Sequence, residues 1–145
     1  MAVFASTITV DGKPLAEYNI PEDKWAEIKH ATIQGGSNII KLRGRSSFQS
    51  PSYQSVLMIQ AAMGGPEFNW PAGCYVNTEK YQNVLMAMPT TIDATGVHFG
   101  EVTGTPEEIA ALDASYAHLQ VMRDEIISLG IIPPVEEWKT INPNL

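Results

Sequence analysis

The most constraining feature of the sequence is a long helical pattern near its end, which has both a start and a stop signal. Thr105-Pro106-Glu107-Glu108 combines an N-cap threonine, proline at the first helical position and a capping-box glutamate. Apolar residues then recur at steps of three and four up to Gly130, a residue typical of helix ends. They are Ile109, Leu112, Tyr116, Leu119, Met122, Ile126 and Leu129. The pattern predicts one helix over 105–129 whose apolar face needs a partner surface.

Strands are the natural candidates for that surface. Residues 72–77, 84–91 and 97–102 read as strands with turn residues between them, and the alternation of Val84, Met86 and Met88 indicates one covered face. Short connections favour antiparallel neighbours. The sequence therefore predicts an α+β fold in which an antiparallel three-stranded meander packs against long helices. Residues 1–10 are expected to add a short extended segment.

Two further helices are predicted upstream. Pro21 suits the first turn of a helix that runs to about Leu42, although Gly35 and Gly36 weaken it and indicate close backbone packing or a local bulge. Ser50-Pro51 reads as an N-cap followed by the first residue of a second helix, which runs to about Met63. That helix is apolar nearly all round, so we expect it to be buried.

The connection between these two predicted helices is polar, and a helix on each side holds it in place. It carries Arg45, Ser46, Ser47 and Gln49, and an exposed connection on a rigid scaffold is a good position for ligand contacts. Arg45 could bind a carboxylate bidentately, or it could be a solvated arginine or part of a salt bridge in an oligomer. The serines and Gln49 could contact a ligand, or only satisfy the backbone and cap the next helix.

Composition excludes several classes of site. At 145 residues the chain fits one domain, and its net charge of −7 argues against a nucleic-acid surface. No Gly-x-Gly-x-x-Gly follows a strand and no Walker-type loop occurs, so the chain alone does not indicate nucleotide binding. His30, His98 and His118 lack metal-ligand spacing, and Cys74 is expected to be a buried small apolar residue.

The remaining expectations concern the core and the compartment. The methionines at 58, 63, 86, 88 and 122 lie in apolar patterns and are expected in the core. Apolar runs such as 56–59 are far too short to cross a bilayer, so no membrane partner is expected. A single cysteine and no recognisable signal peptide favour a cytoplasmic protein.

A resemblance to a known family takes the interpretation further. The run 39–48 resembles the signature by which lactate and malate dehydrogenases enter their late active-site loop: a Lys-Leu-(Lys/Arg)-Gly-like helix end, one residue, Ser or Thr, a small residue and an aromatic. Residues 6–15 are similar to the Ser-Thr-x-x-Val-x-Gly-x-Pro-Leu segment of the family, and 72–76 to its Pro-Cys-x-x-Tyr-Leu strand. The tail 131–145 is similar to a bacterial malate dehydrogenase ending.

The resemblance implies that residues 1–145 form the substrate-binding, C-terminal domain of this family, without its N-terminal Rossmann domain. In the family, NAD is held by the Rossmann half and hydride passes between malate or oxaloacetate and the nicotinamide, a step of the tricarboxylic acid cycle. Ser46 matches the hydroxyl residue beside the substrate. Ser50 matches a neighbouring position near the nicotinamide, although helix capping explains it equally well.

The catalytic residues of the family have no match among the other polar residues of this chain. None of the three histidines matches the catalytic position, and neither Arg43 nor Arg45 matches a substrate arginine. We therefore expect no catalytic residue and no metal site in this chain, NAD only in the intact enzyme, and no activity of the chain alone. The alternative is a non-catalytic ligand-binding or self-association module derived from this domain. A homo-oligomer is expected in either case, because apolar helices would be left uncovered.

Overall fold

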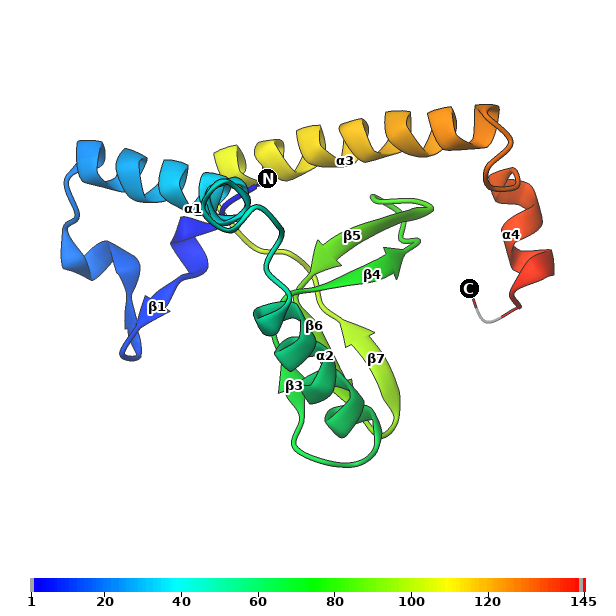
Figure 1. The fold of residues 1–145 in the computed structure, drawn as a ribbon, viewed down its shortest axis with the longest axis horizontal. Helices are drawn as coiled ribbons and strands as arrows, with labels where there is room; N and C mark the ends of the chain where they lie inside the picture. Colours follow the sequence, from blue (N-terminus) through cyan, green and yellow to red (C-terminus); the bar gives the residue numbers. More distant parts are fainter. Residues whose placement is uncertain (1, 144) are drawn as a thin grey trace.

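The computed structural model describes residues 2–143 and 145. Four α-helices form the main body: α1 (Glu22–Arg43), α2 (Gln49–Ala62), α3 (Pro106–Ser128) and α4 (Val135–Ile141). Figure 1 shows α3 running along one side of the molecule, with α1 and α4 at its opposite ends and α2 beside a small sheet. The predicted α+β class is confirmed.

The strands form three small antiparallel sheets. Near the N-terminus, β1 (Thr9–Val10) pairs with β2 (Lys13–Pro14), and β4 (Ala72–Val76) pairs with β5 (Val84–Met88). The third sheet has the order β3-β6-β7. Its strands are β3 (Phe68–Asn69), β6 (Thr90–Asp93) and β7 (Gly96–Phe99).

This topology corrects the predicted three-stranded meander in one respect. The segments 72–77, 84–91 and 97–102 are antiparallel neighbours as expected, but the middle one is broken at Pro89 into β5 and β6, which belong to different sheets. Proline has no N–H to donate to a strand ladder, which explains why the pairing changes there. The short strand β3, which the sequence patterns did not predict, completes the β3–β6–β7 sheet.

Two apolar clusters form the core. The larger one joins the inner faces of β4 and β5 to α3, whose only buried residue is Leu112. Its strand-side members are Cys74, Val76, Tyr81, Val84, Met86 and Met88. The smaller cluster lies between α2 and the β3–β6–β7 sheet, and contains Ala61, Phe68, Ala72 and Ile92. Cys74 is buried as predicted, with its Sγ 3.1 Å from Thr90 Oγ1.

The first two helices are far more exposed than predicted. Every residue of α1 is described and none is buried, while α2 buries only Ala61. Leu42 is 87% exposed and Met63 is 81% exposed, so the expected burial of the second helix and of Met63 is wrong for this chain. Met122 in α3 is also exposed, contrary to expectation. A Cβ added at Gly35 or Gly36 would meet nothing within 4 Å, so neither glycine is in close contact with another part of the structure.

The ends of the chain also differ from expectation. The extended segment predicted for 1–10 is reduced to the two residues of β1, preceded by a 3-10 turn at Ala5–Thr7. The tail forms α4, in which the centre of the Trp138 ring lies 6.2 Å from that of the Tyr75 ring. Trp138 Nε1 donates to the carbonyl of Pro133 at 2.8 Å. No helix among the described residues combines the length and apolarity needed to cross a bilayer.

The start of α3 is confirmed in detail and has a second role. Thr105 Oγ1 accepts from Glu108 N at 3.3 Å, while Glu108 Oε2 accepts from Thr105 N at 2.9 Å. Glu108 Oε1 also accepts from Ser6 N at 2.9 Å, and Ser6 Oγ donates to Oε2. These hydrogen bonds, above all that from the Ser6 side chain, lower the pKa of Glu108. One carboxylate therefore caps α3 and fastens the N-terminal segment to it.

We expect Glu108→Gln to destabilise the fold by about 1 kcal/mol at neutral pH, because it removes the charge that three donors share. The pKa of Glu108 is lower in the folded state, so its contribution is present above the ordinary glutamate range and is lost as the pH falls through the lowered value. Urea unfolding at several pH values would measure this. Glu137→Gln, an exposed glutamate at the corresponding position in the first turn of α4, is the matched control, and an equal loss for both variants at neutral pH would contradict the role of Ser6.

Candidate functional site

The connection between α1 and α2 spans residues 44–48, and its geometry begins with a left-handed glycine. Gly44 has φ +69° and donates its N–H to the carbonyl of Ile40 at 2.8 Å, which ends α1. A residue with a Cβ is strained in this conformation, whereas glycine is not. The chain then turns away from the helix axis and presents Ser46 on the surface, where its side chain is exposed.

Ser50 is not the N-cap that the sequence suggested. The helix α2 begins at Gln49, with Phe48 in the N-cap position and no capping hydrogen bond from its side chain. Ser50 therefore lies inside the first turn, where it is exposed. The prediction that Ser50 caps α2 is therefore wrong. Only the family resemblance indicates a site role for this residue.

The ring of Phe48 lies close to two basic side chains, one at the end of α1 and one in the connection. The guanidinium carbon of Arg45 lies 4.9 Å from the centre of the Phe48 ring, and that of Arg43 lies 5.8 Å from it. Arg43 Nη1 also donates to Gln49 Oε1 at 3.0 Å. Arg43, Arg45 and Gln49 are thus held around one aromatic ring. Arg45 and Gln49 were singled out from the sequence, whereas Phe48 was noted only as the aromatic of the family signature and not as a partner of the arginines.

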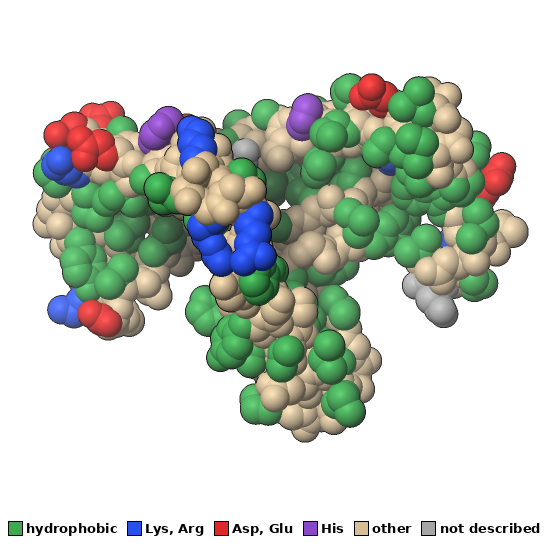
Figure 2. All heavy atoms as spheres, in the orientation of Figure 1, with side chains coloured by type: hydrophobic (Ala, Val, Ile, Leu, Met, Phe, Trp, Pro, Cys, Tyr) green, Lys and Arg blue, Asp and Glu red, His purple; other side chains and the backbone are tan. Residues whose placement is uncertain are grey.

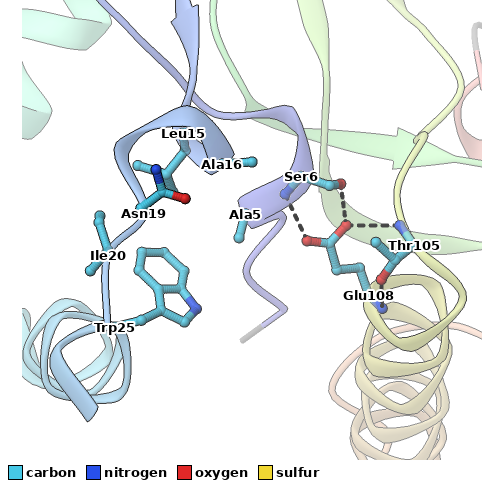
Figure 3. Close-up of a pocket in the computed structure, with 9 residues that line it drawn as sticks. All are labelled: Ala5, Ser6, Leu15, Ala16, Asn19, Ile20, Trp25, Thr105 and Glu108. Atoms are coloured by element: carbon cyan, nitrogen blue, oxygen red, sulfur yellow. Dashed lines mark hydrogen bonds between the residues drawn. The ribbon is translucent and has the colours of Figure 1, made fainter. Parts of the chain in front are cut away.

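Two hollows of the described surface lie away from this connection. One, of about 490 Å³, lies between the start of α1 and the N-terminus of α3, and Figure 3 shows Trp25 on one side and the Ser6–Glu108–Thr105 hydrogen bonds on the other. The second, of about 830 Å³, is a mostly apolar groove along β5 and α3 that includes Leu85 and Leu119. Neither Ser46 nor Ser50 lines either hollow. The connection is thus an open surface in this chain.

The histidines do not converge. His98 lies on the β6–β7 hairpin, where Nε2 is 2.8 Å from Thr95 Oγ1 and 3.6 Å from Asp93 Oδ1. Thr95 donates to Asp93 from its hydroxyl and its backbone, which lowers the pKa of the Asp93 carboxyl. Sequence analysis missed this carboxylate–histidine pair, but it belongs to a two-strand hairpin and not to the α1–α2 connection. Within the described part of the chain, no three His, Cys, Asp or Glu side chains are grouped so that they could hold a metal ion.

A second polar cluster joins the β4–β5 connection to α3. Tyr81 Oη donates to Asp113 Oδ1 at 2.8 Å, and Lys80 Nζ lies 2.9 Å from the same oxygen. Hydrogen bonds from Lys80 and then Tyr81 lower the pKa of Asp113, while burial and the bond to Asp113 raise that of Tyr81. Nothing in the sequence pattern pointed to this cluster, because its members are more than thirty positions apart. It fastens the sheet to the helix.

Comparison with known proteins gives a consistent result. The malate dehydrogenase of Geobacillus kaustophilus is 33% identical over 116 residues, which is 77% of this chain and 37% of that enzyme. Malate dehydrogenase from Plasmodium falciparum has a similar structure, with a TM-score of 0.79 and 25% identity over 86% of this chain and 42% of that one. The same enzyme in complex with NADH matches with a TM-score of 0.75 at 25% identity, over 86% of this chain and 43% of that one.

These matches cover only part of the length of each relative. No protein-family model matches the chain. The chain spans little more than a third of the length of the curated relatives it matches. The α+β architecture described above corresponds to the C-terminal region of the solved structures.

Proposed function

The chain is homologous to the C-terminal region of the malate dehydrogenases, and on that premise we propose that it is the substrate-binding part of an NAD-dependent malate dehydrogenase. In the intact enzyme, hydride would pass between malate and NAD to give oxaloacetate and NADH. The observation that carries this proposal is the match in sequence and fold across most of the chain.

Within this proposal the chain contributes a hydroxyl group and a scaffold. Gly44 ends α1 so that Ser46 is presented on the surface, where its hydroxyl can donate to or accept from a substrate oxygen. NAD, when bound, supplies the hydride acceptor. By the family resemblance, Ser50 is the residue of this chain nearest to the nicotinamide, and the described residues include no glycine-rich loop after a strand to hold a pyrophosphate. The cofactor is therefore proposed to be held outside this chain.

We also propose that the 145-residue chain is inactive by itself. General acid–base catalysis needs a titratable group within hydrogen-bond reach of the reacting oxygen. The histidine that is paired with a carboxylate, His98, lies on the β6–β7 hairpin and not at the connection that carries Ser46. A serine hydroxyl cannot take over the proton transfer of an imidazole.

An NADH-linked oxaloacetate reduction assay tests this function. We expect no turnover by the chain alone, and turnover when it is mixed with a separately expressed Rossmann half of a related enzyme. In the active mixture, Ser46→Ala should lower kcat/KM about tenfold, the effect of one lost hydrogen bond to substrate. Ser37→Ala, an exposed serine of α1, is the matched control. Turnover by the chain alone would contradict its inactivity, and no turnover in any folded mixture would contradict the proposed function.

One observation favours a second candidate, a self-association module. Large apolar side chains are exposed along both α1 and α2, and Figure 2 shows apolar groups spread over this side of the molecule. They include Ile33, Ile40, Leu42, Tyr53, Val56 and Ile59. Exposed apolar surface of this kind favours a homo-oligomer. Sedimentation over a range of concentrations tests it: a stable dimer without ligand supports assembly, and a monomer at all concentrations contradicts it.

A further inference from the structure

The charges of this chain are strongly segregated. Residues 28–66 contain four of its nine cations and none of its sixteen carboxylates, so the remainder of the chain carries all of the negative charge. The four cations are Lys29, Lys41, Arg43 and Arg45. Figure 2 shows Lys and Arg side chains gathered where α1 ends and the connection to α2 begins. An acidic protein thus carries one local cationic surface.

The arginines of this surface differ in their partners from the three cations of the chain that form ion pairs. Lys24, Lys80 and Arg123 each form an ion pair with a carboxylate, at 2.9, 2.9 and 2.8 Å. Among the described residues, the polar partner of Arg43 is the neutral Gln49, and no carboxylate pairs with Arg43 or Arg45. The positive charge of the pair is therefore not compensated within the described chain.

The helix end accounts for only part of this arrangement. The carbonyl groups at the C-terminus of α1 favour cations, which explains Lys41 and Arg43 in its last turn. Arg45 lies beyond that turn and stacks on Phe48 instead. The guanidinium groups of Arg43 and Arg45 lie 5.8 and 4.9 Å from the centre of the same ring, so one aromatic side chain positions two like charges.

Stacking on an aromatic ring also prepares a guanidinium group for binding. It limits the rotamers of a long side chain, so less entropy is lost when a ligand arrives. The planar fork of donors then matches the oxygens of a carboxylate or a phosphate. A ligand with two negative charges would compensate both arginines at once.

We propose that Arg45 and Arg43, held on Phe48, form a binding site for a small dianion, either a dicarboxylate or a phosphate. This goes beyond the proposed function, because neither arginine matches a substrate arginine in the family resemblance. Arg45 is the principal contact, since it lies closer to the ring and outside the helix. Phe48 is a positioning residue that acts through both arginines.

Calorimetric titration of the full chain with succinate, and separately with inorganic phosphate, tests the proposal at low and constant ionic strength. We expect binding in the millimolar range, with Arg45→Gln weakening it about tenfold and the double variant Arg43→Gln/Arg45→Gln abolishing it. Phe48→Leu keeps both charges and should still weaken binding several-fold. Lys29→Gln, which removes one charge from the same acid-free segment outside the stack, is the matched control and should leave binding within about twofold.

The outcomes separate the two sources of the dianion. Binding of succinate alone identifies a dicarboxylate site, binding of phosphate alone identifies a phosphate site, and mutual competition shows that one site serves both. NMR shifts of the Phe48 ring and the arginine side chains during the titration locate the ligand independently of any variant.

Absence of binding by either probe would overturn the proposal. So would an equal effect of Lys29→Gln and Arg45→Gln, or no effect of Phe48→Leu, because net charge alone would then explain the attraction. None of these measurements requires enzymatic activity, so they stand apart from the test of the proposed function.

Discussion

Phe68→Ala is expected to lower the free energy of unfolding by about 3–5 kcal/mol, a large part of the total stability of a domain of this size. Phe68 is 4% exposed and fills the centre of the smaller cluster, where β3 pairs it with Ile92 and α2 supplies Ala61. Truncation would remove most of the aromatic surface from this cluster and leave a cavity that a short strand and one helix cannot close. Urea unfolding followed by circular dichroism measures the change.

Phe99→Ala is the matched control, because it makes the same substitution at a side chain of the same sheet that is 38% exposed. We expect it to cost well under half as much. Similar losses for the two variants would show that α2 does not depend on the smaller cluster for its position. A change confined to α2 and β3 in hydrogen exchange would show that this cluster opens separately from the larger one.

Leu112→Ala is expected to cost about 2–5 kcal/mol, and to detach α3 from the β4–β5 sheet before the rest of the fold is lost. Leu112 is the only buried residue of this long helix, at 7% exposure, and it joins the cluster that contains Val76 and Met86. The capping box and the Tyr81–Asp113 hydrogen bond would remain. They are polar contacts near the surface, and such contacts stabilise too little to replace a buried side chain.

Leu129→Ala at the end of the same helix is the control, because Leu129 is 66% exposed. It should change the free energy of unfolding by less than about 0.5 kcal/mol. Equal losses for Leu112→Ala and Leu129→Ala would contradict the inferred position of the core. A normal stability of Leu112→Ala in an oligomeric sample, with a loss only after dilution, would show that contacts between chains support α3.

Local signals in the sequence were sufficient for the presence of α1, α2 and α3 and for the start of α3. The Thr105–Glu108 capping box and the apolar stripe of α3 each depend on residues within a few positions of one another. Their energetics are decided within one turn of helix, so a linear pattern contains the needed information. The strand segments were likewise visible, since alternation along β4 and β5 is a local property.

The candidate site was predictable only in part. Its place on the chain and the residues Arg45, Ser46 and Gln49 followed from composition and from the family resemblance. The stack of Arg43 and Arg45 on Phe48 did not, because it depends on side-chain rotamers that the sequence leaves open. The position of Ser50 within the helix likewise became visible only in the structure, which starts α2 two residues earlier than the proline indicated.

The sequence by itself determined the α+β class, the start and end of α3, and the polar connection between two helices. Only the tertiary structure decided which apolar surfaces are covered, and this is where the expectations for α2 and its methionine Met63 were wrong. An apolar helix sequence predicts that the helix will be covered. The covering surface, however, comes from residues distant in sequence or from another chain. The exposure of α1 and α2 depends on such long-range contacts, which no local pattern specifies.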